Sequence, residues 1–90
     1  MKNSPHEVFS EAIDLMVTSE KSMRERVLEA YAEHISHINV ADLPFDVQYL
    51  FQSFKSCMEP RLITRDFSIQ EARQMAKVVL FLAEEIKKYR

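Results

Sequence analysis

The sequence contains no glycine in 90 residues, although average usage of about 7 % would supply roughly six. Glycine is the residue that most readily adopts positive φ and lets a backbone approach a ligand closely. Its absence excludes the glycine-rich phosphate loop, the dinucleotide-binding fingerprint and the nucleophile elbow, because each of these motifs requires it. The tight Asn-Gly and Asp-Gly hairpins of β-rich folds are excluded as well. We therefore expect an all-α protein.

Cysteine and long apolar runs are equally scarce. Cys57 is the one cysteine of the sequence, so a disulfide within the chain is excluded. No run of 18 apolar residues is present that could cross a bilayer, and the first residues hold no apolar run of signal-peptide length. These absences favour a soluble, cytoplasmic protein that does not bind a membrane.

Hydrophobic residues, by contrast, make up 47 % of the chain, and the net charge is −2. Ninety residues correspond to a single domain, 1–90, and one small core has limited capacity to bury so much apolar side chain. The charge is also uneven, since residues 1–54 have a net charge of −5 and residues 55–90 a net charge of +3. This asymmetry fits either an ordinary solvated surface or an antiparallel self-association in which acidic and basic halves meet.

Apolar residues recur every three to four positions in four stretches, which is the spacing of one helix face. The pattern predicts a small four-helix bundle. The predicted helices span about 5–17, 20–38, 43–58 and 69–88. A turn at 18–22 is favoured over one long kinked helix, and both alternatives stay open. Residues 59–67, which include Pro60, are expected to form the longest irregular segment.

Polar residues at the predicted helix starts support these boundaries. Ser4 and Glu7 form the sequence pattern of a capping box, and Ser68 and Glu71 repeat it before the last helix. Asp42 is the expected cap of the third helix.

The histidines and the cysteine are the first candidates for chemistry. His34 and His37 are three residues apart, a spacing with which a helix can chelate a metal ion. No further ligands stand at matching positions, so we interpret His34 as a structural residue at the edge of the core and His6 as a surface residue. Cys57 lacks a thiolate-stabilising environment in its local sequence and is expected to be buried and inert. No metal or cofactor is expected.

Catalytic side chains are not evident either. The Asp and Glu residues of the predicted helices map to outer or flanking positions, where burial does not tune a pKa. No nucleophile stands beside a base. We therefore expect no catalytic residues and interpret the chain as a non-enzyme.

Four basic residues surround the third predicted connection: Lys55, Arg61, Arg65 and Arg73. Together with the start of the last helix they could contact an anion or an acidic partner. Glu59, Asp66 and Glu71 are interleaved with them and weaken their field. The third predicted helix carries Lys55 as its single cation, fewer than a DNA-recognition helix normally has. A nucleic-acid-associated or anion-binding regulator is therefore kept only as the alternative function.

Exposed apolar residues give the main functional hypothesis. Phe45 and Tyr49 lie one turn apart on the side of the third predicted helix that faces away from its apolar stripe. Val78 and Phe81 lie away from the inward face of the last helix. Either the first predicted helix or residues 59–67 cover them, or they form a protein interface. We favour a non-enzymatic protein-interaction module that self-associates, as a dimer, and binds another protein.

Overall fold

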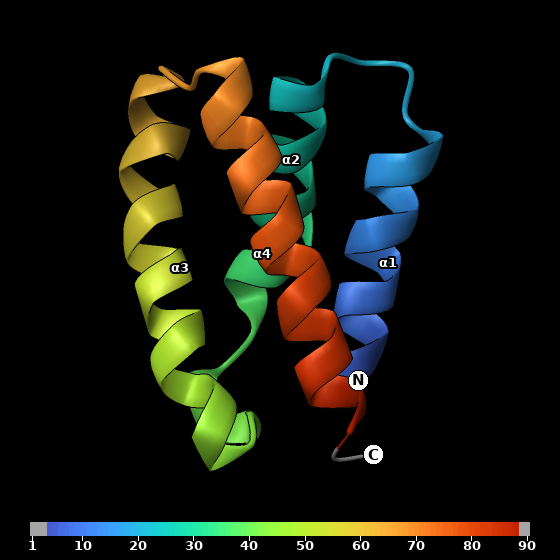
Figure 1. The fold of residues 1–90 in the computed structure, drawn as a ribbon, viewed down its shortest axis with the longest axis vertical. Coiled ribbons are helices and arrows are strands. Elements are labelled where there is room, and N and C mark those ends of the chain that lie inside the picture. The colour runs from blue at the N-terminus through green and yellow to red at the C-terminus, as the bar shows by residue number, and fades with distance from the viewer. Residues whose placement is uncertain (1–3, 89–90) are drawn as a thin grey trace.

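Four α-helices build the part of the chain that the computed structural model describes, residues 4–88 (Figure 1). They are α1 (Pro5–Thr18), α2 (Met23–Glu33), α3 (Phe45–Thr64) and α4 (Ile69–Lys87), with two short 3-10 turns, η1 (Ile35–His37) and η2 (Val40–Asp42), between α2 and α3. No strand occurs between residues 4 and 88. The predicted all-α four-helix bundle is confirmed.

Serine side chains begin three of these helices. Ser4 and Ser22 each accept a hydrogen bond from the backbone N–H three residues later, at 3.3 Å. At α4 the capping box is complete, because Ser68 Oγ accepts from the Glu71 N–H at 3.0 Å and Glu71 Oε1 accepts from the Ser68 N–H at 3.1 Å. Residues 19–22 separate α1 from α2, and Ser22 caps the start of α2, so α1 and α2 are separate helices.

The region between α2 and α3 departs from the prediction. The second helix was predicted to reach residue 38, but α2 ends at Glu33. The Ser36 hydroxyl donates to the Ala32 carbonyl at 3.0 Å, and such side-chain bonds compete with regular helix hydrogen bonding. Asp42 was wrongly predicted to cap the third helix. It lies in η2, and α3 begins after Pro44 without a side-chain cap.

The third helix is longer than predicted. It continues through Pro60 to Thr64, so the prediction of an irregular segment at 59–67 is wrong for residues 59–64 and correct for residues 65–67. Proline has no backbone N–H, so Pro60 cannot donate to the carbonyl of Ser56, four residues earlier. Ser56 and Pro60 are both exposed, on the side of α3 that faces water. The helix ends at Arg65, whose φ of 55° is left-handed. Glycine normally occupies such an end position, and in this glycine-free chain an arginine takes it.

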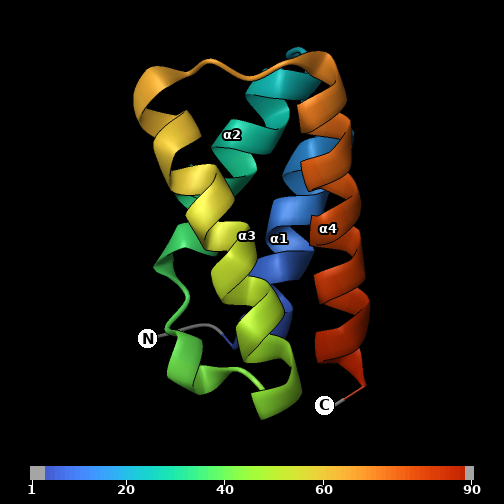
Figure 2. The same ribbon diagram turned by 60° about the vertical axis from the view of Figure 1, so that its left-hand side comes forward.

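The core is formed by one side of each helix. Helix α4 packs against α1, α2 and α3, whereas α3 packs mainly against α4 and α2 at one edge of the bundle (Figure 2). Two edge-to-face ring pairs lie inside it, Phe9 with Phe51 at 6.5 Å and Tyr31 with Phe54 at 5.7 Å between ring centroids. Ile69, the first residue of α4, lies outside the core and is 61 % exposed. None of the helices within residues 4–88 combines the length and apolarity of a bilayer-spanning helix.

Candidate protein-interaction surface

Helix α3 carries apolar side chains on two opposite sides. Its core side is formed by Val47, Phe51, Phe54 and Met58, which are buried. On the opposite side Phe45 is 86 % exposed, Tyr49 80 % and Ile63 85 %. Exposed residues with this orientation form a surface that we call the outer face of α3: Phe45, Tyr49, Gln52, Ser53, Ser56, Pro60 and Ile63.

The outer face of α3 contains no charged residue. The exposed charged residues of α3, Asp46 and Glu59, lie on either side of it. A surface helix of a globular protein normally presents charged and polar residues opposite its apolar stripe. The outer face of α3 lacks such charges, and in this it resembles a protein interface. At the centre of protein interfaces charged residues are depleted and aromatic residues are enriched.

No other described part of the chain covers this face. The alternative that residues 59–67 fold over the aromatic pair is wrong, because most of that segment is the last part of α3 itself. Its two large aliphatic residues differ, since Leu62 packs against the core while Ile63 is exposed. With α2 and α4 as its main neighbours, α3 therefore presents its outer face to solvent (Figure 2).

Comparison with known proteins gives no further guidance. No known protein family, curated protein or solved structure matched this chain. Its function must therefore be inferred from its own residues.

The two candidate residues on α4 differ in position. Phe81 is 50 % exposed and borders a hollow of about 260 Å³ between α3 and α4, which is also lined by Asp46, Val47, Leu50 and Glu85. Val78 is half-buried and packs against the core. The structure thus places Phe81 beside α3. Val78, which its spacing predicted to be an exposed contact, is instead half-buried against the core. Sequence reasoning missed Ile63, because it was assigned to a loop.

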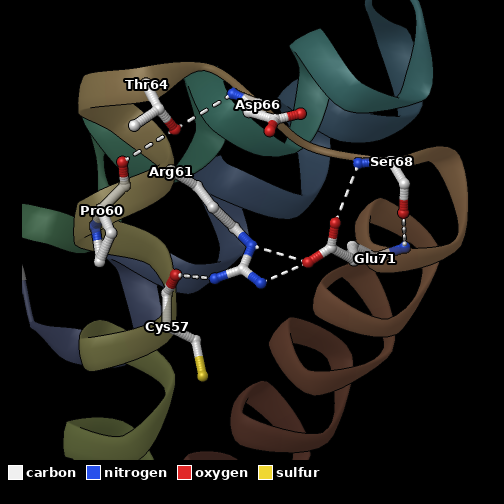
Figure 3. A network of polar contacts seen from close by, with 7 residues as sticks. All are labelled: Cys57, Pro60, Arg61, Thr64, Asp66, Ser68 and Glu71. Carbon is white, nitrogen blue, oxygen red and sulfur yellow. Dashed lines mark hydrogen bonds and ion pairs between the residues drawn. The ribbon is translucent and has the colours of Figure 1, made fainter.

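Arg61 binds within the molecule at the junction of α3 and α4 (Figure 3). Its Nε donates to Glu71 Oε2 at 3.1 Å, a second guanidinium nitrogen also pairs with this oxygen, and a third contact reaches the Cys57 carbonyl at 2.6 Å. Its guanidinium carbon lies 5.9 Å from the centre of the Phe67 ring. The hydrogen bond from Arg61, followed by that from the Ser68 backbone, holds the pKa of Glu71 below its usual value.

The four basic residues of the predicted anion site do not converge. Arg65 is exposed at the left-handed end of α3. Arg73 lines a surface hollow of α4 together with Glu71 and Lys77, whereas Lys55 borders a different hollow with Val40 and Glu59. Arg61 is engaged by Glu71. This arrangement does not favour the anion-binding alternative.

The histidines and the cysteine form no site in the described residues. His34 is half-buried, as expected, and its Nδ1 lies 3.6 Å from Glu11 Oε2. His6 is half-buried too, although it was predicted at the surface, and it lines a hollow together with Leu43, Pro44 and Ile86. Within residues 4–88 no three His, Cys, Asp or Glu side chains are grouped to hold a metal ion.

Cys57 was predicted to be buried, and it is exposed. Successive helix residues are turned by about 100°, so the residue before the buried Met58 points well away from the core. The prediction rested on the usual burial of cysteine and took no account of this position.

Two polar contacts between helices were also missed. The hydroxyl of Tyr31, a residue with no exposed surface, donates to Glu59 Oε2 at 2.5 Å. Burial first, and the neighbouring Glu59 second, raise the pKa of Tyr31 above its ordinary value. Arg26 is half-buried and donates to the Met16 carbonyl at 2.8 Å. It thereby satisfies a carbonyl near the end of α1, whose last turn holds no basic residue.

Proposed function

We propose that this protein is a non-enzymatic helical module that binds protein partners through the outer face of α3. The observation that carries the proposal is an uncharged helix face on which Phe45, Tyr49 and Ile63 are each four-fifths or more exposed. Phe45 and Tyr49 lie one turn apart. Aromatic side chains of this kind contribute most of the binding energy at many interfaces.

The polar contacts of the structure support a non-catalytic interpretation. The Arg61–Glu71 pair joins the end of α3 to the start of α4, and the Tyr31–Glu59 bond joins α2 to α3. Both contacts are explained by helix packing. An exposed Cys57 without a second cysteine in the sequence also fits a reducing compartment, and we propose the cytoplasm.

The test is affinity capture with three immobilised proteins, offered an extract of the source cells that also contains free, tagged copies of this chain. They are the wild type, Phe45→Glu, and Val17→Glu as the control, since Val17 is also an exposed apolar residue (72 %) but lies on α1. Circular dichroism first establishes that all three have the same helix content.

We expect the wild type and Val17→Glu to retain the same protein, and Phe45→Glu to lose it by at least about tenfold. A buried, unpaired glutamate in an apolar contact accounts for a loss of that size. Equal retention by all three proteins, or none by the wild type, contradicts the proposed function.

A further inference from the structure

We propose that the partner of the outer face of α3 is a second copy of this chain, with the two α3 helices packed antiparallel about a twofold axis near residue 54. This inference rests on the proposed function and adds the identity and orientation of the partner. Three properties of the outer face lead to it: the positions of its apolar ends, its small uncharged middle, and the charges beside it.

The apolar ends are placed symmetrically. Phe45 and Ile63 are 18 residues apart, which is five helical turns, so they lie on one line along α3 and about 27 Å apart. Both are at least 85 % exposed. A twofold rotation about the midpoint, residue 54, places Phe45 of each copy level with Ile63 of the other. The same rotation places Tyr49 level with Glu59, one residue before the apolar ring of Pro60.

The middle of the outer face is formed by Gln52, Ser53 and Ser56, which are exposed and uncharged. Short serine side chains allow two helix axes to approach to the usual 8–10 Å. Their hydroxyls and the Gln52 amide each both donate and accept hydrogen bonds. A twofold axis places these groups next to the same groups of the other copy, and each donor then has an acceptor available.

The helix dipoles and the charge before α3 favour the antiparallel orientation. Asp42 is exposed just before α3 begins. Parallel helices would place this carboxylate beside that of the other copy and would align the two helix dipoles, and both effects are unfavourable. In the antiparallel arrangement the dipoles oppose each other, and Asp42 comes level with Asp66, beside which Arg65 supplies a positive charge.

The expected interface is small. With the exposures given above, the rings of Phe45 and Tyr49 offer roughly 250–400 Å² in each copy. Two copies and the remaining residues of the face together bury on the order of 1,000 Å², near the lower end of specific interfaces. We therefore expect a dissociation constant in the micromolar range, and a dimer that dissociates on dilution.

The experiment combines molar mass with cross-linking. Light scattering follows the wild-type protein over a concentration series from about 1 to 500 μM, which spans the micromolar range. For cross-linking, Cys57 is first replaced by serine, because its thiol is exposed. Phe45→Cys and Ile63→Cys variants are then treated with a short bismaleimide, each alone and as a mixture. A Glu20→Cys protein mixed with Ile63→Cys is the control, since exposed Glu20 lies outside α3.

We expect the molar mass to approach twice that of the monomer, and the Phe45→Cys and Ile63→Cys mixture to yield at least about ten times more cross-linked dimer than the control mixture or either variant alone. Cross-linking of Phe45→Cys to itself as efficiently as in the mixture overturns the antiparallel orientation. A monomer at every concentration, with no cross-linking in the mixture, overturns the identity of the partner. If the protein is monomeric but Phe45→Glu still loses the partner in the affinity capture experiment, the proposed function stands. If Phe45→Glu retains as much partner as the wild type, both inferences fail.

Discussion

Replacing Tyr31 by phenylalanine removes one hydroxyl from the contact between α2 and α3 and leaves the ring in place. That hydroxyl donates to Glu59 at 2.5 Å, while the ring has no exposed surface and packs edge-to-face on Phe54. The variant therefore tests the hydrogen bond and not the core packing. We expect Tyr31→Phe to fold with unchanged helix content and to be less stable.

The magnitude follows from the nature of the acceptor. Hydrogen bonds to a charged group contribute about 1.5–3 kcal/mol. Glu59 is exposed, so water solvates its carboxylate in the variant, and we expect a loss of about 1.5–2 kcal/mol in the free energy of unfolding at pH 7. For a domain of this size that corresponds to a decrease in Tm of roughly 6–16 °C.

The burial of the Tyr31 hydroxyl, together with its bond to Glu59, predicts a dependence of stability on pH. The folded state raises the pKa of Tyr31, so above about pH 10 the unfolded chain loses the phenolic proton while the folded protein keeps it. The unfolded state then binds fewer protons, and stability falls as pH rises, by up to about 1.4 kcal/mol per pH unit. Tyr31→Phe lacks the phenolic hydroxyl and does not lose stability in this way. The difference in free energy of unfolding between the wild type and Tyr31→Phe therefore becomes smaller above pH 10.

Urea unfolding followed by circular dichroism at pH 7 and at pH 10–11 measures both effects. Tyr49→Phe is the matched control, because its hydroxyl belongs to a side chain that is 80 % exposed, and its stability should equal that of the wild type. A Tyr31→Phe protein within about 0.5 kcal/mol of the wild type at pH 7, the range of ordinary surface substitutions, refutes the reasoning. A difference that is unchanged above pH 10 refutes the pH argument alone.

Two further predictions concern the backbone of α3, and urea unfolding measures both. Pro60→Ala should increase stability by about 1–3 kcal/mol, because it restores a donor inside the helix; a loss of stability would show that α3 does not continue through this position. Arg65→Gly should increase stability by about 1 kcal/mol, since Arg65 has a φ of 55° and glycine adopts it without strain. Arg65→Ala is the control, because alanine has a Cβ atom and keeps the backbone strain at positive φ. An equal gain in stability in both variants would assign the effect to the lost charge.

Much of the fold could be predicted because local chemistry determines it. The spacing of apolar residues identified all four helices, and the serine caps at Ser4 and Ser68 gave the starts of α1 and α4. The errors arose where tertiary packing or the conformation of a single residue determines where a helix ends. Pro60 is tolerated because it lies on the exposed side of α3, and Arg65 ends that helix in a conformation that its residue type does not indicate.

The candidate site could be predicted only in part. The exposure of Phe45 and Tyr49 follows from the position of the buried stripe on the same helix, and the structure shows both residues at the surface. Ile63 could not be assigned to this face until α3 was known to extend past Pro60. The partners of Arg61 could not be found from sequence, because its contact with Glu71 depends on the turn at residues 65–68.

The contacts of α4 also have a consequence for how the chain folds during its synthesis. Of the four helices, α4 leaves the ribosome last, and like α2 it packs against each of the other three. Domains generally fold as units during or after synthesis, and the first three helices lack the part of their core cover that α4 provides until residues 69–87 have emerged. We therefore expect nascent chains of this protein to expose apolar core surface during that interval and to be bound by chaperones that recognise apolar segments.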